Sequence, residues 1–385
     1  MRSFQAFACF FIGCMLVQIC KAQQQHFVVN GQIIGVDNGS VQLFPVGVND
    51  RFRDLKVDSG IFSIRNGKFV LTGKMDYPHA FYIFIKNETV FLPSDIIFIA
   101  PGIQSLTISA DSIKNRTPVI HNSPSNSEFL NVFIKEGYGL LTNNYNDYLS
   151  DLQHVSRRYS GSIPDSIRLR MEADRDEIRQ SKHRYLYKYA TLKPDSYVSL
   201  WIAVDLFSSG GYSLELEKTF ESMAPKIKRT KTGKYLHFAL MKSKKVSPGQ
   251  SFPIRNLADT AGKFQKISFV NNKFTLIDFW YSNCAPCIKQ FPELLSLNER
   301  YKSKGFGIVQ ISIDAEARRG SMINLINQYS LYWPHFWDKN GVKTSGYFIN
   351  QFPTNILVDS RGIIVAKNLG IASLGKYLEN SLDNQ

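Results

Sequence analysis

The chain has 385 residues, of which 44% are hydrophobic and 20% charged, and its formal net charge is +14. At roughly 100–200 residues per domain, this length supports two or three domains with ordinary cores, so no disulfide framework is needed. Much of the basic excess lies between Arg157 and Lys188 and between Lys226 and Lys245, where it predicts solvated helix surfaces. Contact with anionic envelope components is the alternative. Because no nucleic-acid-binding motif accompanies these charges, we expect no nucleic-acid partner.

Residues 1–22 match the pattern of a secretory signal peptide. Arg2 is followed by an apolar stretch from Phe4 to Ile19 and then by small residues up to Ala22, where we expect cleavage. The stretch is short for a membrane span, which needs about 20 apolar residues. An uncleaved anchor and a lipid anchor on Cys20 are the alternatives, and the bulky Ile19 disfavours the second. Cleavage would remove three of the five cysteines, namely Cys9, Cys14 and Cys20.

Three units follow the signal in chain order. Residues 23–122 consist of short apolar runs separated by turn residues, which predicts an antiparallel β-rich domain. Residues 123–245 have helical periodicity, with helices expected to open near Ser127, at Asp165 and at Ser196.

Residues 246–385 alternate strands and helices, which predicts a mixed α/β sheet with a parallel pair and a closing hairpin. The expected strands are residues 274–280, 306–313, 354–358 and 363–368, and the expected helices are residues 285–304, 320–329, 342–350 and one from 373 onward.

The remaining two cysteines form the motif Cys284-Ala285-Pro286-Cys287 at the expected start of a helix. Unpaired N–H groups at a helix N-terminus stabilise a thiolate, so we assign Cys284 as the nucleophile and the more interior Cys287 as the resolving thiol. Half of a zinc site is the alternative, but the seven histidines offer no second pair of ligands. We therefore expect no metal and no cofactor other than the redox-active disulfide.

Asp278 lies within the apolar run that precedes the cysteine pair. A carboxylate buried there is costly, and burial would raise its pKa into the range useful for proton transfer. The alternative is an aspartate turned to solvent at the strand end.

Several motifs together resemble a thioredoxin fold, and more closely the TlpA/ResA-type thiol-disulfide oxidoreductases of bacterial envelopes. The resemblance covers residues 246–385 and rests on the cysteine pair with residues 251–253, 259–262, 276–280, 311–314 and 352–354 and Pro292. The preceding part resembles the β-rich domain of unknown function and helical spacer that accompany such domains in Bacteroidetes proteins.

The resemblance implies roles for further residues. It places Asp278 beneath the cysteines, where it deprotonates Cys287 through a water. It also implies a cis peptide at Pro353 beside Cys284, with Phe352 and Trp280 as the other substrate-binding residues. The residues alone predict only a proline at a strand start. Asn283 and Gln290 depart from the family pattern, which frequently has tryptophan and glutamate there.

The function implied is a periplasmic thiol-disulfide oxidoreductase that exchanges electrons with client protein disulfides, in the reducing direction, with a membrane-bound electron donor. Cytochrome c biogenesis is one role that the resemblance suggests. A peroxiredoxin-like peroxidase is disfavoured because Ile277 and Tyr281 stand where its proline and threonine belong. The alternative from another class is an envelope binding protein whose N-terminal domain binds a partner. The sequence leaves the client and the oligomeric state open.

Overall fold

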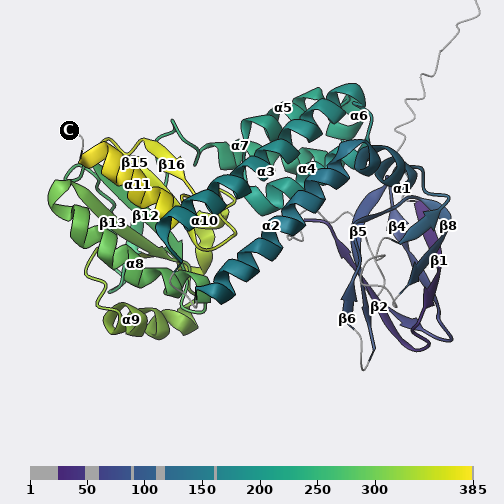
Figure 1. Cartoon of the computed structure of the whole chain (residues 1–385), viewed down its shortest axis with the longest axis horizontal. Helices are drawn as coiled ribbons and strands as arrows, with labels where there is room; N and C mark the ends of the chain where they lie inside the picture. The colour runs from purple at the N-terminus through teal and green to yellow at the C-terminus, as the bar shows by residue number, and fades with distance from the viewer. Residues whose placement is uncertain (1–24, 48–59, 88–90, 110–117, 160–162, 384–385) are drawn as a thin grey trace, which may run out of the picture.

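The computed structural model describes residues 25–47, 60–87, 91–109, 118–159 and 163–383. The expected signal peptide and its cleavage site at Ala22 lie outside the described residues. Figure 1 shows three successive units, a β-sandwich, a helical unit and a mixed α/β unit, so the expected multidomain architecture is confirmed. No helix in the described ranges is long and apolar enough to span a membrane.

The first unit contains two sheets that share one apolar core. Its strands are β1 (Gln25–Ile34), β2 (Gly39–Pro45), β3 (Ile61–Ile64), β4 (Lys68–Met75), β5 (His79–Lys86), β6 (Phe91–Pro93), β7 (Ile97–Ile99), β8 (Gly102–Ser109) and β9 (Val119–His121). One sheet has the order β4-β1-β8-β9, and the other has the order β3-β2-β5-β6 with β7 also paired to β5. Alternate residues of both sheets, such as Val29 and Ile83, are buried in the common core.

The expectation of an antiparallel domain needs one correction. β1 pairs in parallel with β8, with Phe27 opposite Gly102, while the other described pairs of this unit are antiparallel. Alternating hydrophobicity predicts which face of a strand is buried but not the direction of its neighbour. The sequence therefore could not reveal this parallel pair.

The helical unit contains more elements than the three expected helices. They are α1 (Pro124–Glu128), the π-helical η2 (Phe129–Tyr138), α2 (Gly139–Arg158), α3 (Asp165–Leu192), α4 (Tyr197–Gly210), α5 (Leu214–Ser222), α6 (Pro225–Lys228) and α7 (Lys231–Lys244). Ser123 and Ser196 cap α1 and α4 by accepting hydrogen bonds from backbone N–H groups, as serine does at helix starts. The starts expected at Asp165 and Ser196 agree with the structure, and α1 begins three residues before the expected Ser127.

The last unit is a seven-stranded sheet with helices on its faces. Its elements are β10 (Asn256–Asp259), β11 (Phe264–Lys266), β12 (Phe274–Trp280), α8 (Ala285–Tyr301), η3 (Lys302–Lys304), β13 (Phe306–Ser312), η4 (Glu316–Arg318), α9 (Arg319–Gln328), β14 (His335–Trp337), η5 (Lys339–Gly341), α10 (Val342–Ser345), β15 (Thr354–Asp359), β16 (Ile364–Lys367) and α11 (Ile371–Leu382).

The strand order is β11-β10-β14-β13-β12-β15-β16, with β12, β13 and β14 parallel and β15 and β16 antiparallel to their neighbours. The expected thioredoxin-like fold is thus confirmed. The short strands β10, β11 and β14 were not predicted, and the helix expected over residues 342–350 is limited to α10.

One side chain of the last unit lies in the core of the helical unit. Phe348 is 7% exposed, and its ring centroid lies 5.8 Å from that of Phe207, 5.7 Å from Tyr235 and 6.0 Å from Phe238. Its φ of 57° places a bulky residue in the left-handed region, at a cost of roughly 1–2 kcal/mol. Burying a phenylalanine contributes about 1.5–3 kcal/mol, which offsets that cost. The loop before β15 is therefore held by the helical unit.

We expect Phe348→Ala to lower the free energy of unfolding by about 3 kcal/mol, because it removes a ring from a packed core. Urea denaturation followed by tryptophan fluorescence measures the change. Val342→Ala is the control, since Val342 is 68% exposed and its truncation should cost little. Equal denaturation midpoints for the two variants would contradict the anchoring role.

Candidate active site

The site begins where β12, an interior strand of the last sheet, ends. β12 lies between β13 and β15, and a three-residue loop connects Trp280 to Cys284. Cys284 and Cys287 form a disulfide with a Cα–Cα distance of 5.2 Å. The two residues are 2% and 1% exposed, so Cys287 is not markedly more buried than Cys284.

Cys284 is the N-cap of α8. Its sulfur accepts a hydrogen bond from the Cys287 backbone N–H at 3.3 Å, and its carbonyl oxygen accepts one from Ile288. This sulfur therefore occupies the position in which a serine or threonine oxygen normally caps a helix. Negative charge at this atom is stabilised by the first N–H groups and the helix dipole, which favours a thiolate at Cys284 in the reduced protein.

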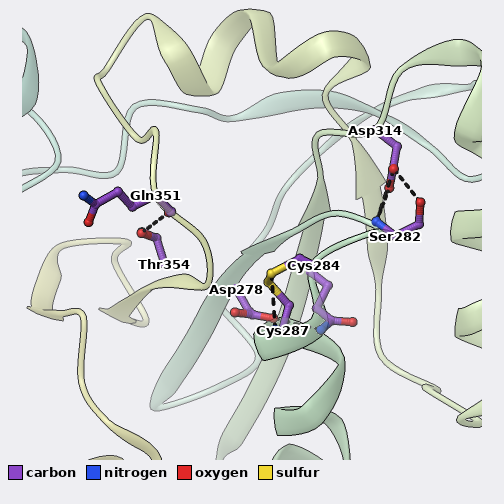
Figure 2. Close-up of a disulfide and its surroundings, with 8 residues drawn as sticks. Asp278, Ser282, Cys284, Cys287, Asp314, Gln351 and Thr354 are labelled. Carbon is purple, nitrogen blue, oxygen red and sulfur yellow. Dashed lines mark hydrogen bonds between the residues drawn. A yellow bond between two sulfur atoms is a disulfide. The ribbon is translucent and has the colours of Figure 1, made fainter. Parts of the chain in front are cut away.

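A buried carboxylate fixes the loop between β12 and Cys284. Asp314, 3% exposed, accepts hydrogen bonds from the Ser282 backbone N–H at 2.9 Å and from its Oγ at 2.7 Å, as Figure 2 shows. It also accepts one from Ser312 Oγ at 2.7 Å. Because several hydrogen bonds from the loop and from β13 converge on this one buried carboxyl group, the cluster holds the loop in place. In the sequence, Asp314 stood out only as part of a motif, and its link to Ser282 was not predicted.

Asp278 is buried in β12 on the side of the sheet that carries the disulfide. Leu276 and Trp280, two residues to either side, belong to the same apolar cluster as both cysteines, and side chains alternate along a strand. Figure 2 shows Asp278 on the strand that leads to the disulfide loop. The alternative of an aspartate turned to solvent is therefore wrong, because Asp278 is only 3% exposed.

Burial raises the pKa of Asp278 to about 7, although a hydrogen bond from Gln310 opposes the shift. Gln310 Nε2 donates to Asp278 Oδ2 at 2.9 Å, and Gln310 Oε1 accepts from Trp333 Nε1 at 3.0 Å. Neither partner was predicted from the sequence. Gln310 is a polar residue within the apolar run of β13, and this anomaly could have indicated from the sequence that it has a buried polar partner.

The loop before β15 lies beside the cysteine loop. The Phe352–Pro353 peptide bond is cis, and Thr354 Oγ1 donates to the Gln351 carbonyl oxygen at 2.7 Å, as drawn in Figure 2. Thr354 pairs with Phe279, the last residue but one of β12, so the preceding residue Pro353 lies level with the C-terminal end of β12. The Phe352 ring packs edge-on against Tyr281, with centroids 5.6 Å apart, which joins the two loops.

Trp280 requires a correction. Its side chain is fully buried and packs edge-on against Phe291, with centroids 5.2 Å apart. A side chain without exposed surface cannot contact a client, so Trp280 supports the helix rather than forming part of a substrate surface. Asn283, which departs from the family pattern, is exposed beside the disulfide.

No group of three or more histidine, cysteine, aspartate or glutamate residues within the described ranges could hold a metal ion. The chemistry that the arrangement supports is exchange at the disulfide, with a carboxyl group nearby that titrates near neutrality.

The raised pKa of Asp278 makes stability depend on pH. The unfolded chain ionises this residue near pH 4 and the folded chain near pH 7, so the wild type should lose stability as pH rises through this interval. Relative to Asp278→Asn, we expect its unfolding free energy to fall by about 1.4 kcal/mol per pH unit between pH 5 and 6, and by less per unit as the pH approaches 7.

Denaturant titrations of the oxidised proteins at several pH values measure this difference. Asp259→Asn is the control, because hydrogen bonds lower the pKa of Asp259 and confine its titration to more acidic pH. If the wild-type and Asp278→Asn curves run parallel from pH 5 to 8, Asp278 is ionised throughout and the burial argument fails.

Comparison with known proteins gives matches to both ends of the chain. The Redoxin family matches residues 247–384, and a domain of unknown function (DUF4369) matches residues 27–129. A thiol-disulfide oxidoreductase ResA of Bacillus cereus is 33% identical over 127 residues, which cover 33% of this chain and 72% of that protein. ResA of Bacillus subtilis is 28% identical over 120 residues, covering 31% and 66%.

Among solved structures, the thioredoxin domain of a thiol-disulfide oxidoreductase from Bacteroides vulgatus is 32% identical, with coverage of 35% of this chain and 98% of that one and a TM-score of 0.32. The Redoxin match encloses the whole site described above, and the DUF4369 match names no activity for the sandwich.

Proposed function

Because this chain belongs to the ResA family of thiol-disulfide oxidoreductases, we propose that it reduces disulfides of client proteins with its Cys284–Cys287 pair. The observation that carries the proposal is the position of Cys284 as the N-cap of α8, with its sulfur facing the Cys287 N–H. This position stabilises the thiolate that exchange requires.

The reaction proceeds in two exchanges. The Cys284 thiolate attacks one sulfur of the client disulfide, which forms a mixed disulfide and releases the other client sulfur as a thiolate that takes up a proton. The Cys287 thiolate then attacks Cys284 Sγ, which forms the Cys284–Cys287 disulfide and releases the second client thiol. Two electrons pass to the client, and an external dithiol donor must return two electrons to the pair.

Asp278 is the proposed base for the second exchange. It lies on the side of the sheet that carries Cys287, and with a pKa of about 7 a substantial fraction of it is ionised at neutral pH. Its carboxylate accepts the Cys287 proton, directly or through a water, and can return it when the disulfide is reduced. Since Gln290 is not acidic, Asp278 carries the proton transfer without a second carboxylate at that position.

The proposed client surface is the loop that contains Phe352 and Pro353. Its contact with Tyr281 keeps it beside the cysteine loop, where backbone groups can pair with an extended client segment.

The proposed location is the periplasm or cell envelope after cleavage near Ala22, and the proposed donor is a membrane-bound dithiol. Both proposals rest on the signal-like composition of residues 1–22 and on the family resemblance. We also propose the domain limits predicted from the sequence, which are residues 23–122, 123–245 and 246–385.

The redox behaviour of the pair tests the direction. In thiol trapping with mass readout across dithiothreitol or glutathione buffers, we expect one reversible two-electron transition at a potential below about −220 mV. A transition near about −120 mV would mark an oxidase instead. If no reversible transition is observed, the oxidoreductase proposal is wrong and the alternative of an envelope binding protein is favoured.

The roles of the two cysteines are separable by substitution. Cys287→Ser should accumulate a mixed disulfide between Cys284 and the client, because the resolving thiol is missing, whereas Cys284→Ser should form none. Non-reducing gels of each variant with a disulfide-bonded client, such as an oxidised apocytochrome c, show the adduct. Equal amounts of mixed disulfide with both variants would refute the assignment of Cys284 as the nucleophile. If Cys284→Ser binds a partner as well as the wild type does and the wild type shows no exchange, the binding-protein alternative is favoured.

A further inference from the structure

A cleft of about 520 Å³ lies between the helical unit and the cis-proline loop. One wall is α3, which contributes Arg175, Arg179 and Lys182. The other wall contains Pro353 and, from α8, Gln290. Because residues three and four apart share one helix face, the three cations line the same side of the cleft. The cleft therefore begins at the loop proposed above to bind clients.

Polar contacts join the two walls of the cleft. Near the start of α3, Arg168 forms an ion pair with Glu293 of α8 at 2.7 Å, and Glu172 accepts hydrogen bonds from Ser373. At the other wall, Gln351 Nε2 donates to the Ser208 carbonyl oxygen at 2.6 Å, close to the Phe348 anchor. Figure 1 shows α3 reaching from the helical unit to the last unit. The cleft is thus a preformed part of the fold.

The lining carries more cationic groups than carboxylates. The side chains of Arg175 and Arg179 are 41% and 42% exposed, and both bond Asp176 Oδ1, at 3.3 and 3.2 Å. Asp176 itself does not line the cleft; the carboxylate that does, Asp205, accepts a hydrogen bond from Tyr82 and interacts electrostatically with Lys182. Lys182 Nζ lies 4.5 Å from the Tyr145 ring centroid. One shared carboxylate leaves most of the N–H groups of the two guanidinium forks available, and such forks bind carboxylates bidentately.

We propose that this cleft is a client subsite that binds an acidic, extended segment next to the client's disulfide. The proposal deepens the proposed function and rests on it. The helical unit then supplies client selection, and the basic face of α3, for which the sequence predicted a solvated surface with anionic envelope components as the alternative partner, binds the client.

The first test measures binding without redox chemistry. Two labelled peptides carry serine in place of the cysteine, one flanked by aspartates and one by lysines, and fluorescence anisotropy reports their binding to the oxidised full chain. We expect the acidic peptide to bind about 10-fold more tightly, and Arg175→Glu to abolish this preference. Arg170→Glu is the matched control, since Arg170 lies on the same helix, is 80% exposed and does not line the cleft. Arg175→Lys should retain part of the preference, because it keeps the charge without the fork.

The second test separates this subsite from the proposed function. Arg175→Glu should raise KM for a peptide disulfide with acidic flanks, while turnover of the uncharged 2-hydroxyethyl disulfide stays at the wild-type value. Equal wild-type binding of both peptides, or a preference that survives Arg175→Glu, overturns the subsite even if 2-hydroxyethyl disulfide is reduced. Failure of the wild type to reduce 2-hydroxyethyl disulfide refutes the proposed function instead, and the anisotropy result still decides the subsite.

Discussion

The burial of β12 on both faces is the constraint on which the site depends. Leu276 and Trp280 face the apolar cluster that contains the cysteines, while Ile277 and Phe279 face the cluster on the other side of the sheet. A carboxyl group in such a strand is almost fully shielded from bulk solvent, which disfavours its charged form unless hydrogen bonds compensate. With one bond from Gln310, Asp278 acquires a pKa of about 7. The packing that makes the strand stable thus also produces a proton acceptor for neutral pH, next to the helix whose N-terminus holds the disulfide.

The three units are joined by buried contacts. The Tyr77 hydroxyl of the sandwich lies 2.8 Å from Thr232 Oγ1, and Trp201 Nε1 donates to the Pro78 carbonyl oxygen at 2.9 Å. Phe348 then places part of the last unit inside the helical core, five residues before Pro353. If the last unit were attached only by a linker, none of its side chains would be buried in the core of another unit. These contacts join the helical unit directly to the loop that contains the cis-proline.

The sequence predicted the parts of the site that have a local signal. The spacing of Cys284 and Cys287 after an apolar run is local, and so is the anomaly of Asp278 within that run. The partners of these residues were not predictable, because Gln310 reaches Asp278 only through the register of two parallel strands. The same holds for Phe348, which looks like an ordinary loop residue until the fold brings it to α4 and α7. Trp280 was assigned to the substrate surface from the family resemblance, which did not reveal that this fold buries its side chain completely.

The shielding of the disulfide is the reason that the proposed function expects client selection beside the reacting pair. Cys284 and Cys287 are almost fully buried, and of the exposed residues around them Asn283, Ala285 and Pro286 are small or neutral, whereas Lys289 is cationic. A client sulfur must nevertheless approach Cys284 along the axis of the bond that breaks. In the proposed function and its client subsite, the energy for that approach comes from contacts beside the pair, at the cis-proline loop and at the wall that the helical unit adds to it. On this proposal, reduction potential and client choice are set by different residues, so we expect changes in the flanking units to alter which client reacts while the chemistry at the helix N-terminus stays the same.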